Sequence, residues 1–347
     1  MYLNRRCFLR RVSELAVVPG SVSWRPSPSR GSQQSEAAIP IIDTHQHLWD
    51  LSRLKLTWLR PPLDRSFTQK DYAEASQGLG VVQAVYMEVA VPAQQRLEEA
   101  EYVIGLCQEP KSMTRAAVIA GSPAEEGFRE YIARFKGSPY VKGVRGALPL
   151  ERMGDRQVIE NLHLLGDLSM RFDLNVSPPA LAEAARLVEQ CPDTRFILDH
   201  CGNADPVAFF PVGRTAPRPA QHAPERWRKD MDKLAARGNV VCKISGIVDN
   251  VPEYPLVADD LAPIINHCLD AFGPDRVVFG SDWPVCLLGA PLRRWVEFLK
   301  EVTANRPEAE RRMLFHDNAV RLYDLARRDG VTGLQPWLME GSHRRAS

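Results

Sequence analysis

Residues 42–47 read IDTHQH, and this stretch decides how the rest of the chain is interpreted. It ends an apolar, β-branched run at 40–45, which predicts a β-strand that closes on two histidines. Because side chains alternate along a strand, His45 and His47 face the same way. Two converging imidazoles can chelate a divalent metal or polarise a carbonyl group. An isolated pair of this kind also often hydrogen-bonds to the backbone, so it needs support from elsewhere in the sequence.

Seven more short strands follow, and helical patterns separate them. The predicted strands lie at 81–89, 115–120, 141–147, 172–176, 195–200, 240–244 and 277–281, and the helical segments at 94–106, 125–136, 155–168, 181–190, 226–237, 261–271 and 291–302. Eight strands, each followed by a helix or by room for one, are typical of an α/β protein built as a single (β/α)8 TIM barrel. The alternative fold is a doubly wound open sheet, which would normally carry a glycine-rich phosphate turn after the first strand. Here two histidines occupy that position.

Two later strands also end on polar side chains. Residues 195–200 read RFILDH and close on His200, while residues 277–284 read VVFGSDWP and contain Asp282. Each has a structural interpretation as well, since neighbours can satisfy a buried histidine and an aspartate can cap a helix. In a barrel, however, the C-terminal ends of all strands meet at one face, where active sites form. We therefore predict that the two first-strand histidines, His200 and Asp282 share one site.

The composition excludes several classes of partner. Of the 347 residues, 44% are apolar and 25% are charged, and the formal net charge is +1. Such a chain can bury a sizeable core, and it has no excess charge that would attract nucleic acid or an anionic membrane surface. No apolar stretch reaches the roughly 18–20 residues that a membrane span requires.

The seven cysteines are odd in number and form no C-x-x-C pair. They therefore predict neither a disulfide framework nor a zinc finger. We interpret most of them as small apolar core residues. Cys201 is set apart because it directly follows His200.

The two ends of the chain differ from its middle. Residues 1–38 are predicted to be an N-terminal extension, in which NRRCFL, with Arg5 and Arg6, resembles a twin-arginine export signal. Glu14 and Pro19 interrupt the apolar run that should follow such a signal. Residues 39–340 form the predicted barrel, and 341–347 a polar, disordered tail. The expected location is cytoplasmic, or periplasmic if the arginine pair is functional.

In combination these motifs resemble the amidohydrolase-related family of the amidohydrolase superfamily, which includes fuconolactonase-like sugar-acid lactonases and pyrone-dicarboxylate lactonases. The resemblance runs from residue 41 to about residue 324. It rests on IDTHQHLWD at 42–50, TWL at 57–59, LDRSFT at 63–68, KGVR at 142–145, LDH at 198–200, CKISG at 242–246 and FGSDWP at 279–284. It implies a barrel that hydrolyses a lactone or a similar carboxylic ester.

The resemblance also implies roles for the predicted site. His45, His47 and His200 would bind a metal ion or polarise the substrate carbonyl. Asp282 would be a metal ligand and the base that activates water. One divalent ion is expected, zinc before manganese, with no required ion as a further alternative. Because a nearby cation lowers the pKa of a carboxyl group, this base should be ionised at neutral pH.

Charged and aromatic residues near strand ends are candidates for substrate binding. A basic side chain that faces the mouth can hold a substrate carboxylate, and an indole can cover a sugar face. The alternative is that the basic groups pair with acidic ones and that the tryptophans only pack. The candidates are Lys142, Arg145, Lys243, Trp58, Trp283 and Glu88.

Some positions depart from the fuconolactonase-like pattern, and these leave the substrate open. Gly146 and Asn203 stand where that pattern has a histidine and a lysine, and Glu88 where a glutamine is commoner. Two other functions share the motifs, namely a metal-dependent decarboxylase on the same barrel and a binding protein that has lost catalysis. The TWL and KGVR motifs favour the lactonase, and the presence of all four site residues argues against an inactive relative. The predicted partner is a small-molecule lactone or ester, and the oligomeric state is left open.

Overall fold

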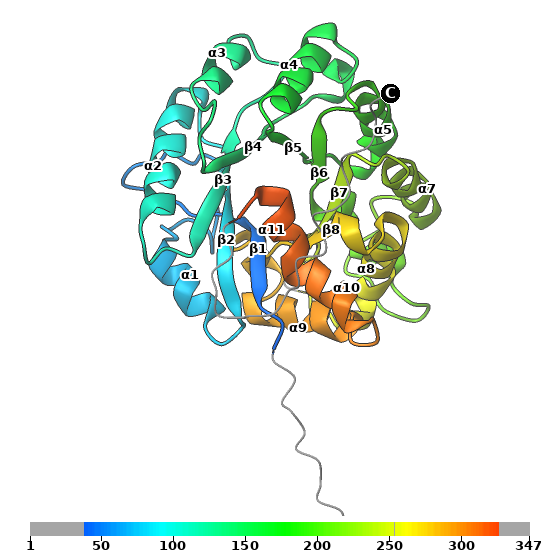
Figure 1. The fold of residues 1–347 in the computed structure, drawn as a ribbon. Helices are drawn as coiled ribbons and strands as arrows, with labels where there is room; N and C mark the ends of the chain where they lie inside the picture. The colour runs from blue at the N-terminus through cyan, green and yellow to red at the C-terminus, as the bar shows by residue number, and fades with distance from the viewer. Residues whose placement is uncertain (1–37, 253, 326–347) are drawn as a thin grey trace, which may run out of the picture. The chain divides into compact units, whose positions relative to one another are not determined.

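Eight parallel strands form the centre of the protein. The computed structural model describes residues 38–252 and 254–325. Hydrogen bonds join the strands as neighbours in the order of the sequence, and the helices surround them (Figure 1). The strands are β1 (Ile41–Gln46), β2 (Val81–Met87), β3 (Thr114–Ala120), β4 (Val141–Arg145), β5 (Arg171–Leu174), β6 (Arg195–Leu198), β7 (Val240–Ile244) and β8 (Val277–Phe279).

Helices alternate with these strands along the described part of the chain. They are α1 (Gln69–Ser76), α2 (Arg96–Gln108), α3 (Phe128–Ala133), α4 (Arg156–Asp167), α5 (Leu181–Gln190), α7 (Pro224–Ala235), α8 (Ala258–Phe272), α9 (Leu292–Val302), α10 (Glu308–Arg312) and α11 (Asn318–Tyr323). The short segment α6 (His200–Asn203) is a turn with left-handed backbone rather than a regular helix.

Contacts between the first and last strands close the ring. The hydroxyl of Thr44 donates to the carbonyl oxygen of Phe279 at 2.6 Å. The backbone N–H of His47 donates to the carbonyl oxygen of Trp283 at 2.8 Å, and Gln46 and Trp283 form a parallel bridge. The predicted single (β/α)8 barrel is confirmed, and the alternative of an open sheet is wrong.

The barrel interior is apolar at one end and polar at the other. Inside the barrel, Ile42, Val85 and Val278 form one apolar cluster with Leu322 and Tyr323 of α11. In Figure 1 this helix lies across the opening of the ring. Helix α11 therefore covers one end of the barrel, and the polar side chains gather at the opposite end, where the strands finish.

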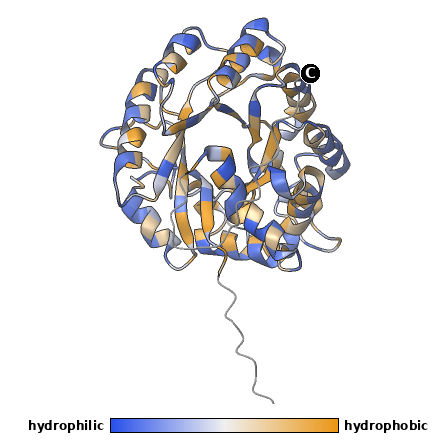
Figure 2. Cartoon of the chain, in the orientation of Figure 1, coloured by the Kyte–Doolittle hydropathy of each residue, from blue (hydrophilic) through white to orange (hydrophobic). Residues whose placement is uncertain are grey.

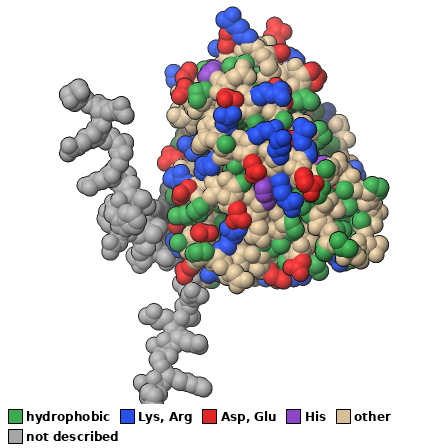
Figure 3. Space-filling model, turned by 90° about the vertical axis from the view of Figure 1, so that its right-hand side faces the viewer, with side chains coloured by type: hydrophobic (Ala, Val, Ile, Leu, Met, Phe, Trp, Pro, Cys, Tyr) green, Lys and Arg blue, Asp and Glu red, His purple; other side chains and the backbone are tan. Residues whose placement is uncertain are grey.

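The layers follow from the pattern of hydropathy. Helix faces toward the strands are apolar and outer faces are polar, as Figure 2 shows. In α8, for example, Ile264, Ile265 and Cys268 are buried at helical spacing. On the face drawn in Figure 3, basic and acidic side chains are interspersed, as expected for a chain with a net charge of +1.

The sequence did not predict α1, α10 or α11. Helix α1 lies between β1 and β2, a region for which we predicted no helix. Its start carries a local signal, because Asp71 accepts hydrogen bonds from the backbone and the hydroxyl of Thr68. A helix of eight residues spans only about two turns, so its sequence shows too little helical periodicity to be distinguished from the polar residues on either side.

The predicted terminal segments lie almost wholly outside the described residues. The structure describes only residue 38 of the extension at 1–38, and none of the tail at 341–347. The boundaries of the three segments therefore stay predictions. No helix in the described ranges combines the length and the apolar character of a membrane span.

Candidate active site

Strand β1 delivers two histidines to the polar end of the barrel. His45 is fully buried and His47 is 6% exposed. The Nδ1 atom of His47 lies 3.1 Å from the carbonyl oxygen of Met87, on β2. A carbonyl can only accept, so Nδ1 carries the proton and Nε2 keeps its lone pair. The strand thus presents His47 as a ligand with a fixed tautomer.

Asp43 ties the beginning of this segment to β8. Its Oδ1 accepts hydrogen bonds from the backbone N–H of His45 at 3.1 Å and of Ser281 at 2.8 Å, and its Oδ2 accepts from the hydroxyl of Tyr72 at 2.6 Å. The sequence motif contains Asp43, but we did not predict this role. A buried carboxylate that collects three donors is a positioning group, because it fixes both strands that carry the site.

Asp282 follows β8 in a left-handed backbone conformation, with φ of 57°. Its Oδ1 lies 3.1 Å from Nε2 of His47 and 3.4 Å from Nε2 of His45. Burial opposes ionisation of this carboxyl group, but the imidazoles of His200 and His47 favour it, and the pKa of Asp282 is lowered. Asp282 is therefore a carboxylate at neutral pH.

His200 also adopts a left-handed conformation, with φ of 54°, in the turn after β6. Its Nδ1 lies 2.9 Å from the hydroxyl oxygen of Ser245, and its ring centroid is 4.6 Å from that of His45. Gly246 leaves room for the ring: a Cβ there would lie 2.1 Å from Nδ1 of His200. Burial lowers the pKa of both histidines, so neutral imidazoles face one another across the site.

The donor atoms of this cluster fit a divalent metal ion. Nε2 of His45 is buried and has no hydrogen-bond partner among the described residues. Around a tetrahedral zinc ion, ligand atoms at about 2.0–2.1 Å from the metal lie about 3.3 Å apart. The distances of 3.1 and 3.4 Å from Asp282 to the two imidazoles match that spacing. Two imidazole nitrogens and one carboxylate oxygen are also a donor set that suits zinc.

A buried ionic network lies beside the cluster. The Nζ atom of Lys243 is 2.6 Å from Asp173, 2.9 Å from Asp199 and 3.2 Å from Nδ1 of His45. Burial alone would lower the pKa of Lys243, but Asp173 and Asp199 raise it, so the ammonium group stays charged. We predicted Lys243 as a substrate contact. It is instead fully buried and paired, because β7 turns it into the barrel among carboxylates from β5 and the end of β6.

Arg145 extends the same network toward the mouth. Its guanidinium donates to Glu88 at 2.7 Å and to Asp199 at 3.0 Å. Arg145 therefore pairs with an acidic group, as the alternative interpretation of the sequence expected. The side chain of Arg145 is 12% exposed and that of Glu88 is 7% exposed, so the pair is not completely buried.

The other three residues that we predicted as substrate contacts lie in three different environments. Lys142 does not join the cluster: its Nζ lies 3.4 Å from Asp324, because residues 142 and 145 face opposite sides of β4. Trp283 is 2% exposed and packs edge-on against two aromatic rings, so it belongs to the core. Trp58 is 39% exposed, and its indole N–H donates to the carbonyl oxygen of Val89, two residues after β2.

A second carboxyl group, Asp249, lies in the segment after β7, and we did not predict it. Burial and the charge of Asp282 raise the pKa of Asp249 well above its ordinary value. The neutral form of Asp249 is therefore favoured over the carboxylate. Its position three residues after the CKISG motif is the only signal in the sequence, and it carries no spacing that would identify a site.

Comparisons with known proteins identify the family of the chain. The family model described as amidohydrolase matches residues 42–325. An L-fucono-1,5-lactonase of Burkholderia multivorans is 30% identical over 297 residues, which cover 82% of this chain and 96% of the relative. A second L-fucono-1,5-lactonase, from Burkholderia ambifaria, is 27% identical and covers 83% of this chain and 97% of the relative.

A solved structure gives the same result. An amidohydrolase of Burkholderia multivorans, crystallised with bound zinc, superposes with a TM-score of 0.69 at 25% identity. The match covers 83% of this chain and all of the solved chain. The matched range covers most of the chain and the fold is the same, so the chain belongs to the amidohydrolase family.

Proposed function

We propose that this protein is a hydrolase that opens a lactone, or a similar carboxylic ester, of a sugar acid or small carboxylic acid. The observation that carries the proposal is the convergence of His45 and His47 on one oxygen of Asp282, from strands 235 residues apart in the chain. The similarity to L-fucono-1,5-lactonases supports the lactone as the bond that is cleaved.

One divalent ion would be held by His45, His47 and Asp282. Zinc is the first candidate, because the donor set suits it and a solved relative contains it. When bound, such an ion polarises a carbonyl oxygen and lowers the pKa of a water molecule. His200 would add a third imidazole to the ion or act directly on the substrate.

Asp282 would move the proton during the reaction. As a buried carboxylate it can accept a proton from the attacking water and return it to the alkoxide that leaves when the ring opens. Its left-handed backbone and the contact of Oδ1 with Nε2 of His47, at 3.1 Å, fix the direction of the carboxylate. A base held in this way loses little entropy when it reacts.

His200 would stabilise the negative charge that develops on the carbonyl oxygen. When the hydroxyl of Ser245 donates to Nδ1, the proton of the neutral ring is on Nε2. That N–H can donate to the oxygen as it becomes anionic, which lowers the barrier more than it stabilises the bound substrate.

Arg145 and Trp58 are the substrate contacts that remain. A carboxylate on the substrate could share the guanidinium of Arg145 with Glu88, and the exposed face of Trp58 could cover a sugar ring. Lys142, Lys243 and Trp283 are no longer assigned to the substrate, since they pair or pack elsewhere.

A panel of substrates tests the proposal. We expect the purified protein to release acid from at least one sugar-acid lactone, seen with a pH indicator, and to release no carbon dioxide from aromatic carboxylic acids. Carbon dioxide without acid release would contradict the lactonase and support the decarboxylase on the same barrel.

A further inference from the structure

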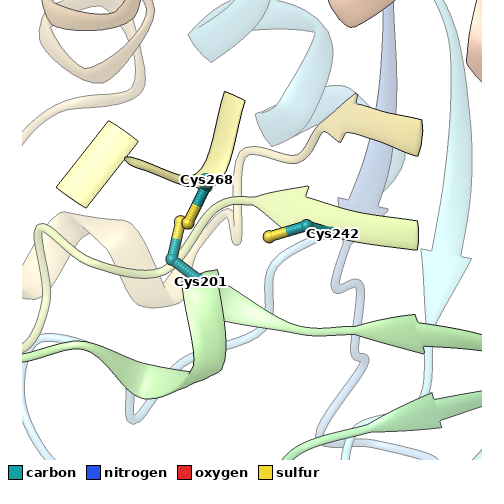
Figure 4. Close-up of side chains that lie close together, drawn as sticks. All are labelled: Cys201, Cys242 and Cys268. Carbon is teal, nitrogen blue, oxygen red and sulfur yellow. The ribbon is translucent and has the colours of Figure 1, made fainter. Parts of the chain in front are cut away.

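We propose that Cys201, Cys242 and Cys268 form a second metal site, which takes one soft, thiophilic cation of the class of Cu(I), Cd(II) and Hg(II). The three sulfur atoms lie within 4.8 Å of one another, and all three side chains are fully buried. Figure 4 shows them converging from separate parts of the fold.

Three different elements supply the thiols. Cys201 lies in the left-handed turn after β6, with φ of 52°. Cys242 lies on β7, next to Lys243, and its side chain points to the opposite face of that strand. Cys268 lies on the buried face of α8. Because strand, turn and helix are fixed by the barrel, the cluster is preorganised and does not depend on a mobile loop.

The spacing of the sulfur atoms suits a three-coordinate ion. Three sulfurs at about 2.3–2.5 Å from a central ion lie about 4.0–4.3 Å apart in a trigonal plane. The observed limit of 4.8 Å therefore requires only sub-ångström movement. A disulfide needs sulfur atoms about 2.05 Å apart and would join only two of the three. All three are free thiols in this structure.

The donor atoms separate this cluster from the candidate active site. Thiolate sulfur is a soft ligand and selects soft cations, whereas imidazole nitrogen and carboxylate oxygen suit zinc and manganese. Cys201 Sγ lies 3.9 Å from the carbonyl oxygen of Lys243, and its other hydrogen-bond partners include the thiols of Cys242 and Cys268, so the weak contacts that an ion would replace lie largely within the cluster.

The sulfur cluster is covalently adjacent to two residues of the polar end of the barrel. Cys201 follows His200, and Cys242 precedes Lys243. An ion that draws the sulfurs together pulls on both backbones, so loading should lower lactone turnover. This consequence rests on the proposed function, whereas binding of the ion does not.

Cadmium is a suitable probe, because only sulfur ligands give it a strong ultraviolet charge-transfer band. The full chain, with one equivalent of zinc already bound, is titrated with Cd(II). We expect a charge-transfer band that saturates at one equivalent, and a cadmium NMR signal in the region of sulfur coordination. The band should disappear in Cys242→Ala and Cys268→Ala.

Cys107→Ala is the matched control, because Cys107 is also a buried free thiol but lies on α2, outside the cluster. It should keep the band. If an alanine variant fails to fold, the serine variant Cys268→Ser and the NMR signal of the unmodified chain still decide the result. A band that persists in both cluster variants, or a signal from nitrogen and oxygen ligands only, would overturn the proposal.

Two further measurements distinguish failure of the sulfur site from failure of the proposed function. Thiol labelling of the unfolded, untreated chain should find Cys201, Cys242 and Cys268 reduced; a disulfide within the cluster would overturn the metal site. A sulfur-bound cadmium ion in a protein without lactonase activity would sustain this site and reject only the proposed function.

Discussion

The backbone N–H of Asp282 donates a 2.9 Å hydrogen bond to the carbonyl oxygen of His45. The last strand is therefore joined to the first at the very residues that form the candidate site. Because the bond is between backbone atoms, the position of the carboxylate relative to the imidazole depends on closure of the barrel and not on a flexible side chain. Stability and activity should consequently be coupled at this end of the molecule.

Enlarging Gly246 should displace His200. In Gly246→Ala the new Cβ would lie 2.1 Å from Nδ1 of His200, at a position with φ of 56°. We expect turnover to fall by at least about tenfold and the free energy of unfolding by about 1–3 kcal/mol, since the ring must leave Ser245. Gly137→Ala is the control, with φ of 76° and open space around its Cβ. Equal turnover in the two variants would show that the position of His200 does not matter.

Removing the charge of Lys243 should destabilise the barrel. In Lys243→Met, two buried carboxylates lose their cation, which typically costs about 3–5 kcal/mol in urea denaturation. The double variant Lys243→Met/Asp173→Asn should recover part of this loss. Lys142→Met is the control, because its exposed partner Asp324 makes that pair worth about 1 kcal/mol or less. A Lys243→Met variant as stable as this control would contradict the network.

Stability should fall between weakly acidic and weakly alkaline pH because of Glu99. Burial, and then the charge of Glu88, raise the pKa of Glu99 from 4.5 to about 8. The folded state therefore holds the proton more tightly, so this contribution is complete below pH 4.5 and is lost as the pH rises toward 8. The slope should approach about 1.4 kcal/mol per pH unit at most.

The variant Glu99→Gln tests whether Glu99 causes this pH dependence of stability. The amide is neutral at every pH and keeps the acceptor for Tyr86 and Val89. Its free energy of unfolding, measured in urea from pH 5 to 8, should lack the part of the slope that Glu99 supplies. If both proteins gave the same slope, Glu99 would not be the titrating group.

Removing divalent metal should remove activity. We expect protein purified without chelator to hold one divalent ion per chain, and chelation to abolish lactone hydrolysis until zinc or manganese is restored. Metal analysis before and after chelation, beside turnover, measures this. Full activity in ion-free protein would mean that neutral imidazoles alone polarise the carbonyl.

The sequence predicts the parts of the site that depend on periodicity. The alternation along β1 places His45 and His47 on one side, and the barrel rhythm brings His200 and Asp282 to the same end. The same alternation would also have excluded Lys142 from the site, because it is three residues away from Arg145 on one strand.

Ion pairs that depend on which strands are neighbours in the barrel could not be predicted from the sequence. Asp173 and Asp199 surround Lys243 because β5, β6 and β7 are neighbours, and each aspartate alone reads as an ordinary polar residue in an apolar strand. The sequence also does not predict the left-handed backbone of His200 and Asp282, although both residue types tolerate that conformation better than most. The need for Gly246 appears only when the ring of His200 is in place.

The most direct test of the central claim is the turnover number for a sugar-acid lactone in Asp282→Asn, beside Asp249→Asn. The pKa of Asp282 is lowered and that of Asp249 is raised, so Asp282 is the carboxyl group that favours the ionised, basic form. We predict that Asp282→Asn loses about 10²- to 10⁴-fold in turnover with an unchanged circular dichroism spectrum, while Asp249→Asn keeps most of its activity. A folded Asp282→Asn protein that hydrolyses the lactone at the unmodified rate would contradict the account.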